Sequence, residues 1–265
     1  MDHTVIYALL ATLGTWAVTA LGAATVVFFK YPSQKMMNLT LGFAAGVMIA
    51  AAYWSLLAPA IEMAEASSLP PYVIVTAGFL CGGIFMWGTD KMICLVQGKI
   101  SPGATPSPPK NNRVFMSVFS ITLHNIPEGL AVGVAFGALR HQMTPEGIMG
   151  AATLALGIGL QNFPEGAAVS LPLRREGYSR KKSFLIGQSS GAVEPVAGVI
   201  GAMLVIFAEA ILPYALAFAA GAMILVAVHE LIPECQSDRE AHPYLSTMGI
   251  IFGFATMMLL DVMLG

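Results

Sequence analysis

The segment "VFMSVFSITLHNIPEGLAVGVAFGAL" (114–139) decides the fold, because polar and ionisable residues interrupt a run that is otherwise long and apolar. Its centre, "HNIPEG" (124–129), has a near-copy, "QNFPEG" (161–166), inside the next apolar run, 146–172. A helix needs about 20 predominantly apolar residues to cross a bilayer, and both runs are long enough. The pair therefore predicts two adjacent membrane-spanning helices with polar groups at matching depth.

The composition of the whole chain agrees with a membrane protein. Of its 265 residues, 56% are hydrophobic and 11% are charged, whereas soluble domains carry about 25% charged residues. The formal net charge is −2 and there is no basic stripe, so nucleic acid is excluded as a partner. Three cysteines lie far apart without CxxC spacing, and we interpret them as small apolar core residues.

The apolar runs predict an all-α polytopic membrane protein with eight transmembrane helices, which form a single domain over residues 1–265. The predicted spans are 5–29, 39–62, 71–97, 114–139, 146–172, 183–208, 212–234 and 244–264. The longest link, 98–112, is rich in Pro, Ser and Gly and is expected to be a flexible cytoplasmic loop.

The basic residues predict how these spans are oriented. Of the 13 Lys and Arg residues, only Arg140 falls in a link on the side opposite to all the others. Cytoplasmic loops carry an excess of Lys and Arg, so both termini are predicted to lie on the non-cytoplasmic side. The chain is expected in the cytoplasmic (inner) membrane if it is bacterial.

Four glutamates lie well inside apolar runs: Glu128, Glu165, Glu194 and Glu230. Ionisable groups in a membrane core are costly, and by default they mark functional sites that face the bundle interior. One such glutamate bonded to a neighbouring helix would be an ordinary structural feature. Four of them, two with amides or a histidine beside them, favour a binding site.

The two motifs place equivalent polar side chains on neighbouring helices: His124, Asn125 and Glu128 on one, Gln161, Asn162 and Glu165 on the other. In each motif the first and last of these residues are one helical turn apart and share a face. The adjacent Asn lies about 100° round the helix. Because the two helices run in opposite directions and each motif begins in mid-span, the clusters should meet near the bilayer midplane, as in transporters with a central site.

A proline occupies the same place in both motifs. Pro127 and Pro164 cannot donate a backbone hydrogen bond, and they are expected to free the carbonyl groups of Leu123 and Leu160. Proline kinks are common in membrane spans, but a membrane tolerates them only where the loosened backbone is buried or lines a cavity. Two such kinks beside carboxylates favour a cavity.

Side chains of His, Asn, Gln and Glu without Cys favour a divalent cation as the ligand of this pocket. A bound cation offsets the charge of buried carboxylates, and nitrogen and oxygen ligands suit Zn²⁺ and also Fe²⁺, Mn²⁺ or Cd²⁺. Glu128 and Glu165, on facing helices, are placed to bridge two metal ions, as carboxylates do in helical di-metal bundles. The lack of thiolates favours a site that releases its ion, and no prosthetic group is expected.

The paired "HNxPEG" and "xNxPEG" helices within eight spans resemble the ZIP (Zrt/Irt-like) family of divalent metal transporters, and the QNFPEG form is similar to its GufA-type branch. The resemblance covers essentially the whole chain. It implies a ZIP-like bundle with a central, binuclear metal site between helices 4, 5 and 6. The ligands that it implies are His124, Asn125, Glu128, Gln161, Asn162, Glu165, Glu194 and Met48.

The resemblance also implies a cytoplasmic release path past His229 and Glu230, for which a core His–Glu pair is the alternative. An ordinary core methionine is the alternative for Met48. Two positions depart from the family pattern, since many members have His where Gln161 stands and some bacterial ones have Asp where Asn162 stands. These departures leave open the second metal ion and the selectivity among divalent ions.

The sequence therefore predicts a carrier, not an enzyme, that moves a divalent cation, Zn²⁺ above all, into the cytoplasm. Its expected partners are the lipid bilayer, the cargo ion and a second copy of the chain in a homodimer. One alternative is an intramembrane metal-dependent hydrolase in which the same ligands activate water. It is disfavoured because the chain has no HExxH motif. The other is a pore for small neutral solutes, which would leave the buried glutamates unexplained.

Overall fold

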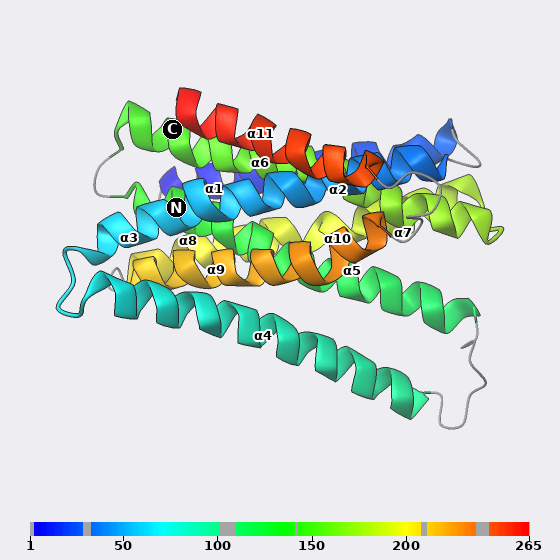
Figure 1. The fold of residues 1–265 in the computed structure, drawn as a ribbon, viewed down its shortest axis with the longest axis horizontal. Coiled ribbons are helices and arrows are strands. Elements are labelled where there is room, and N and C mark those ends of the chain that lie inside the picture. Colours follow the sequence, from blue (N-terminus) through cyan, green and yellow to red (C-terminus); the bar gives the residue numbers. More distant parts are fainter. Residues whose placement is uncertain are drawn as a thin grey trace.

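The computed structural model describes residues 3–28, 33–100, 110–140, 143–207, 211–236 and 244–264, and every regular element among them is a helix (Figure 1). The α-helices are α1 (His3–Ala24), α2 (Gln34–Ala51), α3 (Ala58–Ala64), α4 (Pro71–Ile100), α5 (Lys110–Ala138), α6 (Pro145–Arg175), α7 (Arg180–Ser189), α8 (Glu194–Phe207), α9 (Leu212–Val226), α10 (Ile232–Cys235) and α11 (Leu245–Leu264). Short 3-10 or π turns continue some of them without a break: η1 (Thr25–Val27) follows α1, η2 (Ala52–Leu57) joins α2 to α3, η3 (Ser190–Val193) joins α7 to α8, and η5 (Ala227–Leu231) joins α9 to α10.

These elements form eight uninterrupted helical segments in the described part of the chain, and each coincides with one predicted apolar run to within a few residues. Five segments, namely α1 with η1, α2 to α3, α4, α9 to α10 and α11, are long and apolar enough to cross a membrane. The all-helical membrane fold is thereby confirmed, whereas the count of eight spans stays a prediction. Both α4 and α5 extend into the predicted loop 98–112, whose residues 101–109 lie outside the described ones.

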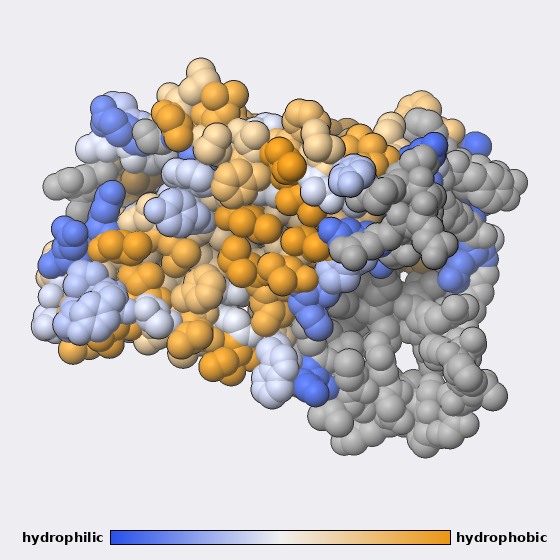
Figure 2. Space-filling model, in the orientation of Figure 1, coloured by the Kyte–Doolittle hydropathy of each residue, from blue (hydrophilic) through white to orange (hydrophobic). Residues whose placement is uncertain are grey.

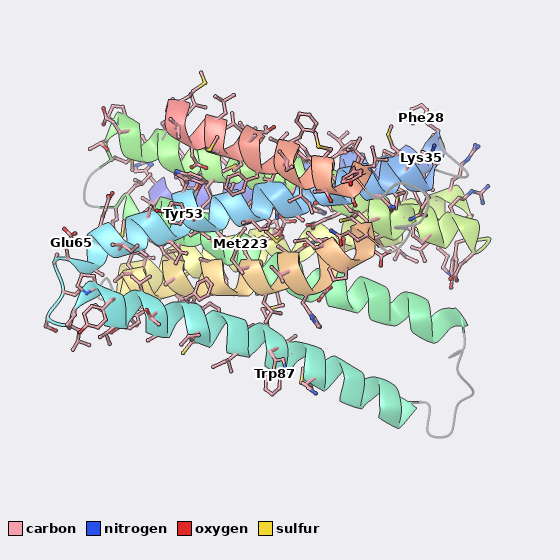
Figure 3. The ribbon with its side chains drawn as sticks, in the orientation of Figure 1. Phe28, Lys35, Tyr53, Glu65, Trp87 and Met223 are labelled. Atoms are coloured by element: carbon pink, nitrogen blue, oxygen red, sulfur yellow. The ribbon has the colours of Figure 1, made fainter. Side chains whose placement is uncertain are left out.

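The surface of the bundle suits a lipid environment. Figure 2 shows hydrophobic residues over the middle of the long axis and hydrophilic residues toward its two ends. Large apolar side chains such as Leu21, Leu80 and Phe252 are exposed on the helices, and so large an apolar surface marks a membrane contact. Lys35 and Glu65 lie at opposite ends of the bundle, outside this apolar middle (Figure 3).

The helices pack in four intimate pairs: α1 with α6, α2 with α11, α4 with α9, and α5 with α8. Glycines permit the close approach of these pairs. A Cβ at Gly129 of α5 would lie 2.6 Å from the backbone oxygen of Glu194 in α8, and one at Gly78 of α4 would lie 2.8 Å from that of Tyr214 in α9. Lipid tails leave no hydrophobic driving force between membrane helices, so these helices associate through close packing, which small residues at the contact permit.

An internal repeat underlies this pairing. The segment "FAAGVMI" (43–49) of α2 matches "FAAGAMI" (218–224) of α9 at an offset of 175 residues. A π turn begins three residues after each segment, at Ala52 and at Ala227. The two helices run in opposite directions along the bundle (Figure 1), so the repeat is inverted.

The helix contacts follow the same repeat. A Cβ at Gly253 of α11 would collide with the backbone oxygen of Phe43, and one at Gly82 of α4 would collide with that of Phe218, the counterpart of Phe43. The α2–α11 pair is therefore equivalent to the α9–α4 pair. The first three and the last three helical segments thus form two inverted units, which pack against α5 and α6.

Candidate metal centre

The two motifs lie in the middle of α5 and α6, and both helices continue through Pro127 and Pro164. Both prolines are buried, as required where the backbone loses a hydrogen bond and must be shielded from lipid. The glycine that ends each motif lets another helix come close. Gly129 contacts the backbone of Glu194 in α8, and Gly166 contacts that of Thr19 in α1.

Six of the sequence-predicted ligands are buried polar residues: Asn125, Glu128, Gln161, Asn162, Glu165 and Glu194. Glu128 and Glu194 have 0% of their surface exposed. Glu165 is 7% exposed, so all three glutamates of the set are buried. Buried carboxylates need compensation by hydrogen bonds or by a cation.

A hydrogen bond joins the two motifs across the α5–α6 contact. Gln161 donates from Nε2 to Oε1 of Glu128 at 2.6 Å. Two side chains that the sequence places on separate helices therefore meet in one site.

Glu194 follows the 3-10 turn η3 and begins α8, and it accepts hydrogen bonds from two other helices. Asn162 of α6 donates from Nδ2 to both carboxylate oxygens at 2.9 Å. Thr19 of α1 donates to Oε1 at 3.4 Å, and Thr15 of the same helix donates to Oε2. This carboxylate is thus met by neutral donors.

Four buried side-chain oxygens of the centre accept no hydrogen bond from the described residues: Asn125 Oδ1, Glu128 Oε2, Gln161 Oε1 and Asn162 Oδ1. Buried polar atoms without partners are rare in folded proteins, and each one calls for an explanation. Carboxylate and amide oxygens are also ligands of divalent cations. The donor set therefore fits a cation that would satisfy these oxygens together.

The two other predicted ligands, His124 and Met48, are not among these buried polar residues. His124 lies in α5 one turn before Glu128, but its side chain is outside the described ones. Met48 of α2 is 1% exposed and belongs to the main apolar cluster of the bundle. Among the side chains that the structure describes, no three of His, Cys, Asp and Glu form a metal site. Without His124, the centre consists of amides and carboxylates.

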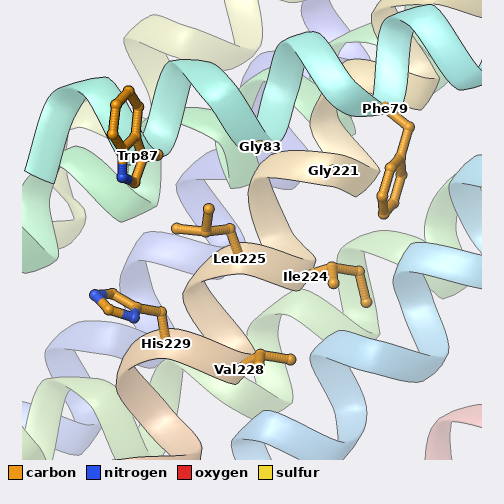
Figure 4. Close-up of a pocket in the computed structure, with 8 residues that line it drawn as sticks. All are labelled: Phe79, Gly83, Trp87, Gly221, Ile224, Leu225, Val228 and His229. Atoms are coloured by element: carbon orange, nitrogen blue, oxygen red, sulfur yellow. The ribbon is translucent and has the colours of Figure 1, made fainter.

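The residues predicted for a release path lie in the π turn η5. His229 is exposed and lines an apolar groove of about 410 Å³ between α4 and α9, together with Trp87, Leu225 and Val228 (Figure 4). Glu230 is half-buried. The assignment of this pair to ion release stays a prediction.

Sequence reasoning missed Thr15 and Thr19. Hydroxyl groups are common in membrane helices, where they bond to the backbone one turn before, as Thr12 does with Ala8 at 2.7 Å. A signal was nevertheless present. Thr12, Thr15 and Thr19 recur at helical spacing in an apolar run and so share one face, and all three are buried.

The repeat extends into the centre itself. Asn125 donates from Nδ2 to the backbone oxygen of Ser190 at 2.8 Å, and Asn162 donates from Nδ2 to that of Thr15 at 3.3 Å. The two amides are 37 residues apart, as the motifs are, and the two acceptors are 175 residues apart, as the α2 and α9 segments are. By the same offsets Thr19 is the counterpart of Glu194, and the centre has two related halves.

Comparisons with known proteins identify the family of the chain. The ZIP zinc transporter family model matches residues 109–261, which is more than half of the chain. The chain is 39% identical to zinc transporter ZIP11 of Homo sapiens, with 99% of this chain and 98% of the relative covered. It is 36% identical to zinc transporter GufA of Myxococcus xanthus, with 97% and 98% covered, and 35% identical to zinc transporter ZIPB of Bordetella bronchiseptica, with 98% and 82% covered. The resemblance to the ZIP family that the paired motifs indicate is thereby confirmed over nearly the full length of the chain. The chain belongs to the ZIP family of zinc transporters.

Proposed function

We propose that this protein carries Zn²⁺ across the membrane into the cytoplasm and binds it in mid-bundle around Glu128. The observation that carries the proposal is the set of four buried oxygens on α5 and α6 that accept no hydrogen bond from the described residues. Full-length relatives named as zinc transporters support the choice of cargo. Membership in a family of transporters removes the intramembrane hydrolase as an alternative.

The proposed ligands are Glu128 through Oε2 and the amide oxygens of Asn125, Gln161 and Asn162, completed by the imidazole of His124. A nitrogen ligand beside oxygen ligands suits Zn²⁺ and other first-row divalent ions. Glu165, one turn after Gln161 on α6, would add a second carboxylate to the site. Among the carboxylates of the set, Glu128 has a buried oxygen that accepts no hydrogen bond from the described residues, so we assign it the main attraction for the ion.

The basic residues support the proposed direction of transport. Lys35 and the start of α7 (Arg180–Ser189) lie at one end of the bundle (Figure 3), which the excess of Lys and Arg predicts to be cytoplasmic. The ion would leave toward that end, past His229 and Glu230. Protons compete with the metal for carboxylate and imidazole groups, so Zn²⁺ affinity should fall as the pH is lowered.

Uptake by the purified protein in liposomes tests the proposal. Glu128→Gln and His124→Ala should abolish the accumulation of radiolabelled Zn²⁺, because they remove the charge and the imidazole from the site. Glu146→Gln is the matched control, since Glu146 is an exposed glutamate in the first turn of α6, and it should transport normally. Liposomes with the unmodified protein that accumulate no Zn²⁺ would refute the function, and full uptake by both site variants would refute the site.

A further inference from the structure

The two fully buried carboxylates of the centre are satisfied in different ways. A carboxylate has about four acceptor positions. At Glu194 both oxygens have donors, since Asn162 reaches both, Thr19 lies 3.4 Å from Oε1 and Thr15 donates to Oε2. The two threonine hydroxyls also reach backbone oxygens of their own helix, those of Thr12 and Thr15. At Glu128 only Oε1 has a donor, Gln161, and Oε2 accepts no bond from the described residues. Among the described residues, both oxygens of Glu194 therefore have hydrogen-bond donors, whereas Oε2 of Glu128 has none and can bind a cation.

The donors around Glu194 are built into the packing of the helices. Thr15 and Thr19 are buried on the face of α1 that packs against α6 and α8. A Cβ at Gly191 would lie 2.9 Å from both Oε1 of Glu194 and the hydroxyl of Thr19. The absence of a side chain at Gly191 is thus needed for this carboxylate and this hydroxyl to meet.

We propose that these hydrogen bonds replace a second metal ion at Glu194, so that each chain holds one cargo ion, on the Glu128 side. This inference rests on the proposed function and departs from the binuclear centre that the family resemblance implies. In it Thr15 and Thr19 are positioning residues that act through Glu194. Hydrogen bonds to a carboxylate stabilise its charged form as a nearby cation does, and those with an ionised partner are about twice as strong as neutral ones. The hydrogen atoms of these donors also occupy the lone pairs of the Glu194 carboxylate that would otherwise bind a cation.

Asn162 links the two sides of the centre. Its Nδ2 donates to Glu194, whereas its Oδ1 accepts no bond from the described residues and is free to bind the cargo. An aspartate at this position would have no donor for Glu194 and would add a negative charge next to it. The amide of Asn162 therefore determines whether Glu194 accepts hydrogen bonds or binds a metal ion.

Metal counting on the purified, full-length protein tests the inference with Zn²⁺ alone as the probe. At saturating Zn²⁺ the unmodified chain should bind one ion, measured by elemental analysis after gel filtration and by calorimetric titration. Asn162→Asp should bind two ions. The double variant Thr15→Val with Thr19→Val, which keeps side-chain shape but removes two donors, should gain a second, weaker ion, and the matching double Ser variant should stay at one.

The number of Zn²⁺ ions bound by each variant shows whether hydrogen bonds replace a second ion at Glu194. Two ions on the unmodified chain, or one ion on both Asn162→Asp and the double Val variant, would overturn the inference while uptake into liposomes continues to support the transport of Zn²⁺. No ion on the unmodified chain would overturn the inference and the proposed site together. If Asn162→Asp does not fold, the double Val variant decides alone, with Thr40→Val as its control because the Thr40 hydroxyl bonds only to its own helix.

Discussion

The two halves of the candidate metal centre have equivalent backbone contacts and differ in the side chains at equivalent positions. In one half Asn125 of α5 donates to the backbone oxygen of Ser190, and in the other Asn162 of α6 donates to that of Thr15. The glycines that follow pack in the same way, Gly129 on α8 and Gly166 on α1. The inverted repeat thus fixes where helices touch, and it does so equally on both sides.

The difference between the halves lies in the side chains at these positions. One half has His124 and Glu194, and the equivalent positions of the other have Gln161 and Thr19. Glutamates at both positions would repel each other, and threonines at both would provide no charge. Because the copies have diverged, the hydroxyl of one half donates to the carboxylate of the other. The proposed function therefore depends on the positions at which the two copies of the repeat differ.

The largest expected effect is a loss of stability when a glycine at the equivalent helix contacts of the two halves is changed. Gly129→Ala and Gly166→Ala should each lower the free energy of unfolding by about 3 kcal/mol, because the added Cβ would collide with the backbone of the partner helix. Thermal unfolding in detergent would measure both variants. Gly14→Ala is the control, since no atom lies within 4 Å of a Cβ at that position. Tolerance of one variant but not of the other would show that these helix contacts are not equivalent.

Loss of the Asn amide should destabilise the protein more in one half of the centre than in the other. Asn162→Ala should cost about 2 kcal/mol of stability, because it leaves the buried carboxylate of Glu194 short of its shared donor. Asn125→Ala removes only a bond to the neutral oxygen of Ser190 and should cost about 1 kcal/mol. The comparison uses the free energy of unfolding at neutral pH without metal. Equal losses would contradict the claim that one amide supports a charge and the other does not.

Much of this centre follows from the sequence. Apolar runs fix the helical segments because their backbone must be hydrogen-bonded internally in lipid, and the spacing within each motif puts Glu128 and Gln161 on faces that do meet. The matching segments 43–49 and 218–224 were also present in the sequence, and a search for repeats at long offsets would have found them. The inverted repeat was therefore predictable in principle.

The partners of Glu194 were not predictable in this way. Thr15 and Thr19 are 179 and 175 residues away along the chain, and a hydroxyl in an apolar run can equally bond to its own helix. Which helix packs against which depends on glycines such as Gly22 and Gly166, whose partners only the three-dimensional structure reveals. Periodicity gives the face of a helix but does not identify what covers that face.

A swap of one side chain between the halves should change metal binding without disturbing the helix contacts. Gln161→His copies His124 into the second half and replaces an amide by an imidazole, which is a better ligand for Zn²⁺. Affinity at neutral pH should rise about tenfold, equivalent to about 1.4 kcal/mol. Because the added imidazole must lose its proton to bind, the gain should vanish as the pH falls below about 6. Titration with Zn²⁺ at pH 5.5 and pH 7.5 measures this, and a gain that is the same at both pH values would exclude direct ligation.

The smallest effect is expected at Thr19, the counterpart of Glu194. Its hydroxyl reaches Oε1 at 3.4 Å, a long bond, so Thr19→Val should lower the free energy of unfolding by about 1 kcal/mol. Thr40→Val, which loses only bonds to its own helix, corrects for the loss of a hydroxyl as such. If Glu194 is first changed to Gln, the cost of Thr19→Val should shrink, because the acceptor is then neutral and the two residues act on each other. An unchanged cost in that double-mutant cycle would mean that Thr19 stabilises α1 alone, and the divergence of the two halves would then have no part in holding the carboxylate.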